Sequence, residues 1–277
     1  MKKIILLTGG GNLPVEVSKF LKKKNIQLFC IGFKNNPLSR EIFNCSHKII
    51  NFGEVVTELK RLNLKGFNKV ILIGNLKRPK IKEIKPDINA IKLIPEFSKV
   101  LFEGGDNKLL NFVTIQLKKL GFNILDLRKL IPEFFLGKGN HTNINISKYN
   151  MHDIKKGELI LNGISKYDIG QSIIVQNGNV IGIEAAQGTD GLIKFSNSII
   201  KKDQQAILIK LAKVKQNLKV DLPTIGINTV KNCKKYNIKG IAFSSGKTLF
   251  LKKEKISRTG KKDSIKKVIK SNLSKKS

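Results

Sequence analysis

The stretch KIILLTGGGNLPVEVSKFLKKKNIQLFCI, residues 3–31, decides the fold of the first half of this chain. Lys3–Leu7 is a short apolar run of the kind that forms a buried parallel strand. The run enters a glycine turn, a helical pattern follows over Val15–Lys24, and a second apolar run covers Gln27–Ile31. A strand, a helix and a strand in this order predict a βαβ unit and therefore a parallel sheet.

The same alternation continues along the first half. Glu54–Leu62 is predicted to be helical and Lys69–Ile73 to be a buried strand. Asn107–Leu120 has a helical apolar stripe, with Asp106 placed to cap it. Asn123–Leu127 is predicted to be a further strand, which extends the parallel sheet.

A stretch rich in Gly, Asn and Thr, with little periodicity, marks a domain boundary. We expect an α/β protein with an N-terminal Rossmann-like parallel-sheet domain at residues 1–135 and a linker at 136–145. A C-terminal mixed α/β domain, which carries the catalytic residues and a basic tail, is expected at 146–277.

The second half opens with a hairpin signal, because Asn-Gly-Asn separates the apolar runs Gln171–Gln176 and Val180–Glu184. The other expected elements are a strand, a helix and two strands that close the sheet, at Ala206–Leu211, Thr229–Tyr236, Gly240–Phe243 and Thr248–Leu251.

The chain is strongly basic, with 53 Lys and Arg against 20 Asp and Glu and a formal net charge of +33. Such a charge attracts polyanions. No zinc-finger spacing, helix-turn-helix signature or RNA-binding aromatic pattern accompanies it, so we expect no specific nucleic acid partner. An anionic membrane surface and phosphorylated substrates remain as expected partners, and a solvated lysine-rich surface is the alternative.

Cysteine usage and hydropathy indicate the compartment. The three cysteines form no CxxC pair and their number is odd, which indicates reducing conditions. The apolar run at the N-terminus is too short for a signal peptide, and no run approaches the ~18 apolar residues of a membrane span. We expect a cytoplasmic protein, either free or peripheral on a membrane.

The tail from residue 252 carries eleven Lys and Arg against two acids. Ile265, Val268, Ile269 and Leu273 fall on one face of a helix. The pattern predicts a terminal helix, which either packs on its own domain or lies as a basic amphipathic helix on a membrane surface, and a frayed end is the further alternative.

Two loops of the first half are candidates for binding phosphate. Gly10, Gly11 and Asn12 lie between the first strand and the first helix, where backbone N–H groups suit an anion. Asn75 and Lys77 follow another strand, at what should be the same edge of the sheet. The glycine loop matches neither GxGxxG nor the Walker A pattern, so a plain strand-to-helix turn is the alternative.

The scarce carboxylates gather in the second half. Glu184 ends a hydrophobic strand and Asp190 closes EAAQGTD, residues 184–190, whereas Asp221 opens DLPTIG, residues 221–226. Carboxylates beside glycines suit a magnesium ion held against phosphate, because Mg²⁺ takes one or two protein carboxylates and completes its shell with water and phosphate oxygens. Helix capping and turn formation would explain Asp190 or Asp221 alone. The three histidines show no spacing that indicates a zinc site or a Ser-His-Asp triad.

At these residues the chain resembles the LpxI-type UDP-2,3-diacylglucosamine diphosphatases of lipid A biosynthesis. The motifs that carry the resemblance are GGGNLP, GNLKRP, GGDNKLL, DIGQ, EAAQGTD and DLPTIG, which begin at residues 9, 74, 104, 168, 184 and 221. The resemblance implies two domains with a cleft between them. It also implies Mg²⁺-dependent hydrolysis of the substrate's diphosphate bond to UMP and 2,3-diacylglucosamine 1-phosphate (lipid X).

The resemblance also assigns positions. It places the family's essential acid at Asp221, its acidic segment at Glu184, Thr189 and Asp190, and its DIGQ segment at Asp168 and Gln171. The chain departs from the family at Gln187, where a carboxylate is usual, and at Phe195, where a basic residue is common.

We expect Asp221, Asp190 and Glu184 to be the catalytic residues. Asp221 and Asp190 are the expected Mg²⁺ ligands, Glu184 is a further ligand or a neighbour of the ion, and the identity of the general base stays open. The expected substrate-binding residues are Gly10, Gly11, Asn12, Asn75, Lys77, Gln171, Thr189, Lys210 and Thr224.

Two other functions compete with this interpretation. A non-catalytic nucleotide- or nucleic-acid-binding protein would use the glycine loop and the net charge, and would not need the acids of the second half. A dinucleotide oxidoreductase is disfavoured because GxGxxG is missing and no acid ends the second strand. The sequence leaves open whether the chain forms a homodimer.

Overall fold

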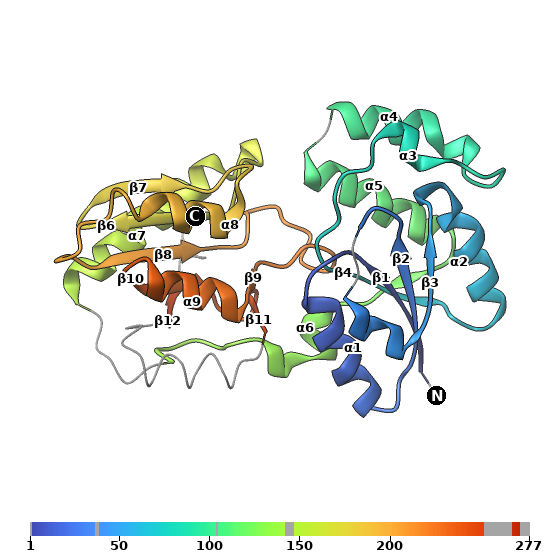
Figure 1. The fold of residues 1–277 in the computed structure, drawn as a ribbon, viewed down its shortest axis with the longest axis horizontal. Helices are drawn as coiled ribbons and strands as arrows, with labels where there is room; N and C mark the ends of the chain where they lie inside the picture. Colours follow the sequence, from blue (N-terminus) through green and yellow to red (C-terminus); the bar gives the residue numbers. More distant parts are fainter. Residues whose placement is uncertain (1, 37–38, 104, 142–146, 252–267, 272–277) are drawn as a thin grey trace, which may run out of the picture. The chain divides into compact units, whose positions relative to one another are not determined.

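The computed structural model describes residues 2–36, 39–103, 105–141, 147–251 and 268–271. The chain divides into two compact units, each with its own sheet (Figure 1). The first unit contains Met1–Leu130 and Asn217–Asp221, and the second contains Ile131–Gln216 and Leu222–Ser277. No helix within the described ranges is both long enough and apolar enough to cross a bilayer.

The first unit is built on five parallel strands in the order β3-β2-β1-β4-β5. The strands are β1 (Lys3–Thr8), β2 (Gln27–Phe33), β3 (Ser46–Ile50), β4 (Lys69–Ile73) and β5 (Asn123–Ile124). The α-helices are α1 (Leu13–Lys23), α2 (Val55–Leu64), α3 (Ile81–Ile84), α4 (Ile94–Glu103), α5 (Asp106–Lys119) and α6 (Leu127–Leu130). This order confirms the Rossmann-like parallel sheet.

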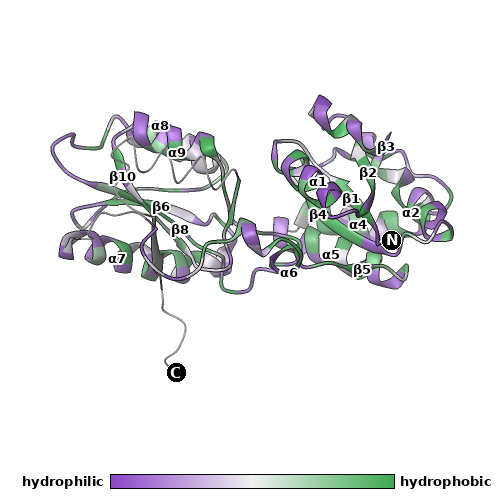
Figure 2. Cartoon of the chain, turned by 90° about the horizontal axis from the view of Figure 1, so that it is seen from below, coloured by the Kyte–Doolittle hydropathy of each residue, from purple (hydrophilic) through white to green (hydrophobic). Residues whose placement is uncertain are grey.

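Apolar side chains from alternate strand positions build the core of the first unit. Ile5 and Ile31 lie in one buried cluster with Leu59 of α2 and Leu117 of α5, so these two helices cover the same face of the sheet. In Figure 2, β1 and β4 are coloured as hydrophobic strands. Burial of both faces explains why their sequences read as continuous apolar runs.

Three local predictions for the first unit differ from the structure. The strand predicted at Asn123–Leu127 is shorter, because β5 covers only Asn123–Ile124 and Leu127 begins α6. The edge strand β3 was not predicted, because SHKII begins with three polar residues and shows neither an apolar run nor an alternation of apolar and polar residues. The prediction that Asp106 caps the following helix is wrong, since Gly105 occupies the N-cap and Asp106 is the first helical residue. The Asp106 carboxylate instead accepts a hydrogen bond from Arg78 Nε at 2.8 Å.

The second unit is built on a mixed sheet in the order β12-β10-β8-β6-β7, in which β6 runs antiparallel to both of its neighbours. Its strands are β6 (Ser172–Gln176), β7 (Asn179–Ile183), β8 (Ala206–Lys210), β10 (Ile238–Ser244) and β12 (Val268–Ser271). Its α-helices are α7 (Lys148–Ile164), α8 (Gly188–Ser196) and α9 (Ile227–Lys235). The expected mixed α/β arrangement is confirmed.

Helices cover both faces of this sheet. Leu192 of α8 and Val230 of α9 pack with Ile174 of β6 in one buried cluster. Ile154 of α7 packs with Ile173 in another. Because neighbouring residues of β6 point to opposite faces, α8 and α9 cover one face and α7 covers the other. The mixed purple and green colouring of α7 in Figure 2 fits its one-sided burial.

The hairpin between β6 and β7 confirms the turn prediction. Asn177 and Gly178 have φ values of 45° and 79°, as a two-residue type I′ turn requires. The carboxylate of Asp153, which is 1% exposed on α7, accepts hydrogen bonds from their backbone N–H groups at 2.9 and 2.6 Å. A buried charge from the helix therefore holds the turn against the α7 face.

Two predictions for the end of the chain are wrong. Thr248–Leu251 was expected to close the main sheet, but β11 (Leu249–Phe250) pairs with β9 (Thr224–Ile225) in a separate two-stranded sheet. The tail was expected to be helical, but Val268–Ser271 forms β12 beside β10. Ile265 and Leu273 lie outside the described residues.

The division into units also differs from the expected boundary. Leu136 is 6% exposed and belongs to the core of the second unit, so the expected linker at 136–145 begins inside that unit. Farther along, Asn217–Asp221 returns to the first unit, where Val220 packs against the Ile5 cluster. Such a return depends on a few long-range contacts and leaves no periodic pattern in the sequence.

Candidate functional site

Glu184 and Thr189 meet where β7 ends and α8 begins. The Glu184 backbone N–H continues the strand ladder by donating to the Ser172 carbonyl at 2.8 Å. The chain then turns, and α8 starts at Gly188. In the first turn of α8, the Thr189 hydroxyl donates to Glu184 Oε1 at 2.9 Å.

Strand register brings two more polar side chains to this point. Ser172 on β6 and Lys210 on β8 are paired residues, and both share the strand face that α8 covers. Both are buried, with 0% and 7% exposure. Lys210 Nζ donates to Thr189 Oγ1 at 2.6 Å, and Ser172 Oγ lies 3.3 Å from the same oxygen.

Proton counting sets the direction of these bonds. The Thr189 hydroxyl has one proton, which it donates to Glu184, and it accepts from the Lys210 ammonium. The Ser172 hydroxyl must then be a donor to Thr189. We call Ser172, Glu184, Thr189 and Lys210 the polar cluster. It combines one carboxylate, one ammonium and two hydroxyls at the end of strands β7 and β8.

The DIGQ segment forms a cradle for Glu184. A Cβ atom at Gly170 would lie 2.0 Å from the Glu184 carbonyl oxygen, so only glycine fits there. The Gln171 backbone N–H points at Glu184 Oε2 at 3.4 Å, and the buried Gln171 Oε1 has no hydrogen-bond partner within the described chain. Asp168, in a left-handed conformation with φ 55°, forms an ion pair with Lys213. Asp168 therefore contributes to local structure.

Asp190 lies next to Thr189 but faces α9. Its Oδ1 accepts a hydrogen bond from Thr229 Oγ1 at 3.3 Å, and the residue is exposed. Burial, and secondarily the negative charge of Asp190, raise the pKa of the Cys233 thiol. Cys233 is thus a protonated core residue, whereas Asp190 is exposed to solvent.

The Gln187 side chain forms hydrogen bonds with backbone groups of the turn that precedes α8. Its Oε1 accepts from the Ala185 N–H at 3.0 Å and its Nε2 donates to the Ile183 carbonyl at 3.1 Å. A carboxylate could make the first of these bonds but not the second. The amide at this position therefore closes the turn between Glu184 and Thr189.

In the first unit, the two candidate phosphate loops are joined by backbone. Gly10 and Asn75 exchange two hydrogen bonds, with N···O distances of 2.8 and 3.0 Å. A Cβ atom at Gly9 would lie 2.4 Å from the Asn75 carbonyl oxygen, so the approach needs glycine. The prediction that both loops lie at one edge of the sheet is confirmed. The Gly10 N–H is engaged in this bridge, and Gly11 and Asn12 lead into α1.

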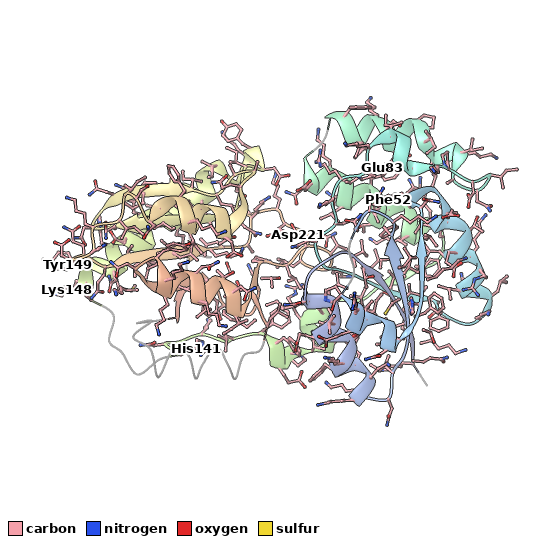
Figure 3. All side chains as sticks on the ribbon, in the orientation of Figure 1. Phe52, Glu83, His141, Lys148, Tyr149 and Asp221 are labelled. Carbon is pink, nitrogen blue, oxygen red and sulfur yellow. The ribbon has the colours of Figure 1, made fainter. Side chains whose placement is uncertain are left out.

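Lys77 and Asp221 also belong to the first unit. The Lys77 N–H donates to Asn36 Oδ1 at 2.8 Å, and its side chain is exposed. Asp221, labelled in Figure 3, is half-buried at the end of the segment that returns to this unit. Thr224 follows in the second unit, where its hydroxyl donates to the Leu222 carbonyl at 3.1 Å.

The structure brings only part of the predicted site together. Glu184, Thr189 and Lys210 share one hydrogen-bonded cluster in the second unit. Asp221 is assigned to the other unit. Among the described residues, no three of His, Cys, Asp or Glu gather closely enough to hold a metal ion. The oxygen chemistry of Glu184 and Asp190 still suits Mg²⁺, which needs only one or two protein carboxylates.

Sequence reasoning missed Ser172, Thr229 and Lys213. Ser172 precedes an apolar strand, which is an ordinary place for a serine, and only its register partner Lys210 reveals its position. Thr229 and Lys213 contact acids 39 and 45 residues away. No local pattern could have indicated contacts of that range.

These features define a two-unit α/β protein with a glycine-lined loop in one unit and a buried ammonium–hydroxyl–carboxylate cluster in the other. Comparison with known protein families identifies the family to which the chain belongs. The LpxI N-terminal domain matches residues 3–134 and the LpxI C-terminal domain matches residues 137–268. The chain belongs to the LpxI family.

A curated relative is 28% identical over 262 residues, which is 92% of this chain and 93% of the relative. It is the UDP-2,3-diacylglucosamine pyrophosphatase LpxI of Caulobacter vibrioides.

Similarity to solved structures is weak. N5-carboxyaminoimidazole ribonucleotide synthetase from Thermotoga maritima shows 16% identity over 68% of this chain and 42% of its own, with a TM-score of 0.23. Glycinamide-RNase-transformylase T from Mycobacterium tuberculosis shows 9% identity over 67% and 44%, with a TM-score of 0.23. The chain spans less than half of either protein, and these scores support no conclusion about the fold.

Proposed function

We propose that this chain hydrolyses the diphosphate bond of UDP-2,3-diacylglucosamine to UMP and lipid X. Membership of the LpxI family makes it a hydrolase that acts on a phosphoric anhydride. The observation that carries the proposal is the match of both LpxI domains across the chain, together with a relative named for this substrate.

The polar cluster supports this chemistry. In the reaction, a water oxygen attacks one phosphorus, the P–O bond of the bridge breaks, and a base takes the proton of the water. The buried Lys210 ammonium can neutralise charge on the diphosphate oxygens. Glu184, which accepts a hydrogen bond from the Thr189 hydroxyl, has the acceptor chemistry to orient the water.

Mg²⁺ belongs to the same proposal. When bound, it would neutralise charge on the diphosphate. Asp190 is the proposed ligand from the second unit, with Glu184 near it, and Asp221 is the proposed ligand from the first. Hard oxygen donors at these positions support the assignment, as does an exposed Asp190 whose hydrogen bond from Thr229 is long, at 3.3 Å.

The first unit is the proposed binding surface for the nucleotide phosphates. Because the Gly10 N–H is engaged with Asn75, the N–H groups of Gly11 and Asn12 at the start of α1 are the better candidates. The exposed Lys77 side chain adds a cation on the loop that bridges to this turn.

Hydrolysis of UDP-2,3-diacylglucosamine by the purified chain, with Mg²⁺ and with EDTA, tests the function. UMP release that EDTA abolishes and added Mg²⁺ restores is expected. Release that EDTA does not change would refute the metal assignment alone. A non-catalytic nucleotide-binding protein would be favoured by two results together. The folded protein would release no UMP, and it would still bind UDP after substitution of Glu184, Asp190 and Asp221.

A further inference from the structure

Ser172 is the member of the polar cluster for which the proposed reaction gives no role. Its side chain is 0% exposed. Within the part of the chain that the structure describes, the partner of its hydroxyl is Thr189 Oγ1, at 3.3 Å. Buried hydroxyl groups are rarely left without a hydrogen-bond partner. The contact with Thr189 therefore accounts for a polar side chain at this buried position.

Strand β6 does not depend on the Ser172 hydroxyl. The Ser172 carbonyl accepts a hydrogen bond from the Glu184 N–H at 2.8 Å, which joins the strand to β7. On the other side, Ser172 is in register with Lys210 of β8. These backbone contacts would remain after removal of the hydroxyl, so a change of the side chain tests the hydroxyl and not the strand.

The Thr189 oxygen is fully used inside the polar cluster. A threonine hydroxyl has one O–H donor and two lone pairs. The donor bonds Glu184 Oε1 at 2.9 Å, and one lone pair accepts from Lys210 Nζ at 2.6 Å. Ser172 occupies the second lone pair. No hydrogen-bonding capacity of this oxygen is then left for a substrate group, so Thr189 acts on its neighbours.

The donors at Thr189 set the direction of its own proton. Because Lys210 and Ser172 both donate to the oxygen, the Thr189 proton has the Glu184 carboxylate as its acceptor. Hydrogen bonds in such a series polarise one another, so each added donor strengthens the bond to the carboxylate. The Ser172 hydroxyl thus strengthens the bond that holds Glu184.

Ser172 also joins three elements at one oxygen. Helix α8 packs on the sheet beside β6 and β8 (Figure 1). Thr189 comes from the first turn of α8, Lys210 from the end of β8 and Ser172 from the start of β6. The Lys210 ammonium and the Glu184 carboxylate both bond the Thr189 oxygen, so the position of that oxygen fixes the positions of both charges.

We propose that Ser172 is a positioning residue for diphosphate hydrolysis, which acts through Thr189 on the Glu184 carboxylate and the Lys210 ammonium. Ser172 is too buried to contact substrate. In the same proposal Thr189 is a positioning residue as well, in place of the substrate contact expected from the sequence. The inference rests on the proposed function, because it concerns the rate of that reaction.

A double-mutant cycle tests the proposal. UMP release is measured for Ser172→Ala, for Thr189→Val and for the double variant. Ser172→Ala should lower kcat about tenfold and leave KM within about twofold, because the hydroxyl aligns reacting groups and does not bind substrate. Thr189→Val should lower kcat further. The double variant should be no slower than Thr189→Val, because Ser172 has then already lost its acceptor.

Two further variants serve as controls. Ser196 is also 0% exposed, and its hydroxyl donates to the Leu192 carbonyl within α8 at 2.8 Å. Ser196→Ala therefore removes a buried serine hydroxyl outside the polar cluster and should leave kcat within about twofold. Thr189→Ser keeps the hydroxyl, so Ser172→Ala should still cost about tenfold in that background. Circular dichroism verifies the fold of every variant.

Unfolding by denaturant measures the same link without reference to activity. If Ser172 donates to Thr189, the loss of stability in the double variant should be smaller than the sum of the two single losses. Wild-type protein that releases no UMP would refute the proposed function. The unfolding cycle would then decide the inference alone, since additive losses refute the link and smaller combined losses support it.

Three results with active protein would overturn the proposal. The first is a kcat for Ser172→Ala within about twofold of wild type. The second is an equal fall of kcat in Ser172→Ala and Ser196→Ala, which would indicate a general effect of a lost buried hydroxyl. The third is a further tenfold fall when Ser172→Ala is added to Thr189→Val, because Ser172 would then act by a route other than Thr189.

Discussion

The two units place different chemistry at the loops that follow their strands. In the first unit, the loops after β1 and β4 meet through backbone alone, with Gly10 bridged to Asn75. In the second, the ends of β7 and β8 bring together the side chains of Glu184, Thr189 and Lys210. The first arrangement joins two loops by backbone hydrogen bonds, whereas the second places a carboxylate, a hydroxyl and an ammonium together.

The difference follows from what each loop must accommodate. Gly9 lies so close to Asn75 that a side chain would collide with its carbonyl oxygen at 2.4 Å. Lys210 instead needs a neighbour that fixes its position, and Thr189 provides a hydroxyl at 2.6 Å. A backbone site is thus sensitive to steric bulk, and a side-chain site is sensitive to loss of a functional group.

Asp221→Ala is expected to have the largest effect. If this acid of the first unit is essential to the reaction, UMP release should fall by about a thousandfold or more while the fold stays intact. Steady-state kinetics measure UMP release, and circular dichroism verifies the fold. The exposed Asp203→Ala is the matched control. Activity of Asp221→Ala within a few-fold of wild type would remove Asp221 from the catalytic set.

Lys210→Met tests the polar cluster of the second unit. Loss of the ammonium should lower kcat by about a hundredfold, because neutralisation of diphosphate charge is needed most in the transition state. Lys156→Met is the control, since Lys156 donates to the Gly178 carbonyl from α7, on the other face of the sheet. An equal loss of kcat in both variants would indicate a structural effect only.

Gly9→Ala tests the backbone bridge of the first unit. The added methyl group must displace the Asn75 carbonyl, which is expected to cost about 1–3 kcal/mol of unfolding free energy. Denaturant unfolding measures that loss, and KM should rise more than kcat falls if the loop binds substrate. Gly163→Ala has open space around it and should leave stability unchanged or higher. An unaltered unfolding midpoint for Gly9→Ala would contradict the tight approach.

Glu58→Gln addresses the acid stability of the first unit. Burial alone would raise the pKa of Glu58, but hydrogen bonds from Arg61 and Lys48 outweigh burial and hold the pKa below its usual value. The folded pKa is lower than the unfolded pKa of about 4.3, so the carboxylate stabilises above that pH and the stabilisation disappears as pH falls through the folded pKa. The variant should lose about 1–2 kcal/mol at neutral pH and nothing at the lowest pH.

Unfolding titrations from neutral to acidic pH measure this dependence. Glu41→Gln is the control, because Glu41 pairs with Lys19 where both side chains are more than half exposed. A variant curve for Glu58→Gln that runs parallel to wild type at all pH values would exclude Glu58 as the titrating group.

Gln187→Glu should have the smallest effect. The new carboxylate keeps the bond from Ala185 but loses the donor to Ile183, which is expected to cost about 0.5–1.5 kcal/mol. Thermal unfolding measures the loss, and the Mg²⁺ concentration for half-maximal activity should stay the same. A marked fall in that concentration would mean that a carboxylate here binds the ion, and that the amide replaced a ligand.

Elements with strong local signals were predicted well. The strands over Lys3–Thr8 and Lys69–Ile73 are buried on both faces and read as apolar runs, and Asn177-Gly178 specifies its turn through positive φ values. Helix α7 was missed because Gly and Asn, which are poor helix formers, recur over Lys148–Ile164. Its stability comes from packing on β6 and β8 rather than from helix propensity.

The candidate site was predicted as a set of residues but not as an arrangement. Glu184, Thr189 and Lys210 were identified by their place after strands or beside glycines, and they do meet. Ser172 joins them only because β6 pairs antiparallel with β8 in one particular register. Asp168 lies beside the same segment, yet its ion pair with Lys213 makes it part of the local structure.

By itself, the sequence determined the parallel sheet of the first unit, the hairpin of the second and the motifs of the family, because these depend on contacts among residues near one another in the chain. Only the tertiary structure decided the pairing of β11 with β9 and the return of Asn217–Asp221 to the first unit. Each of these depends on which distant surfaces are buried, and burial is set by packing of the whole unit rather than by any local pattern.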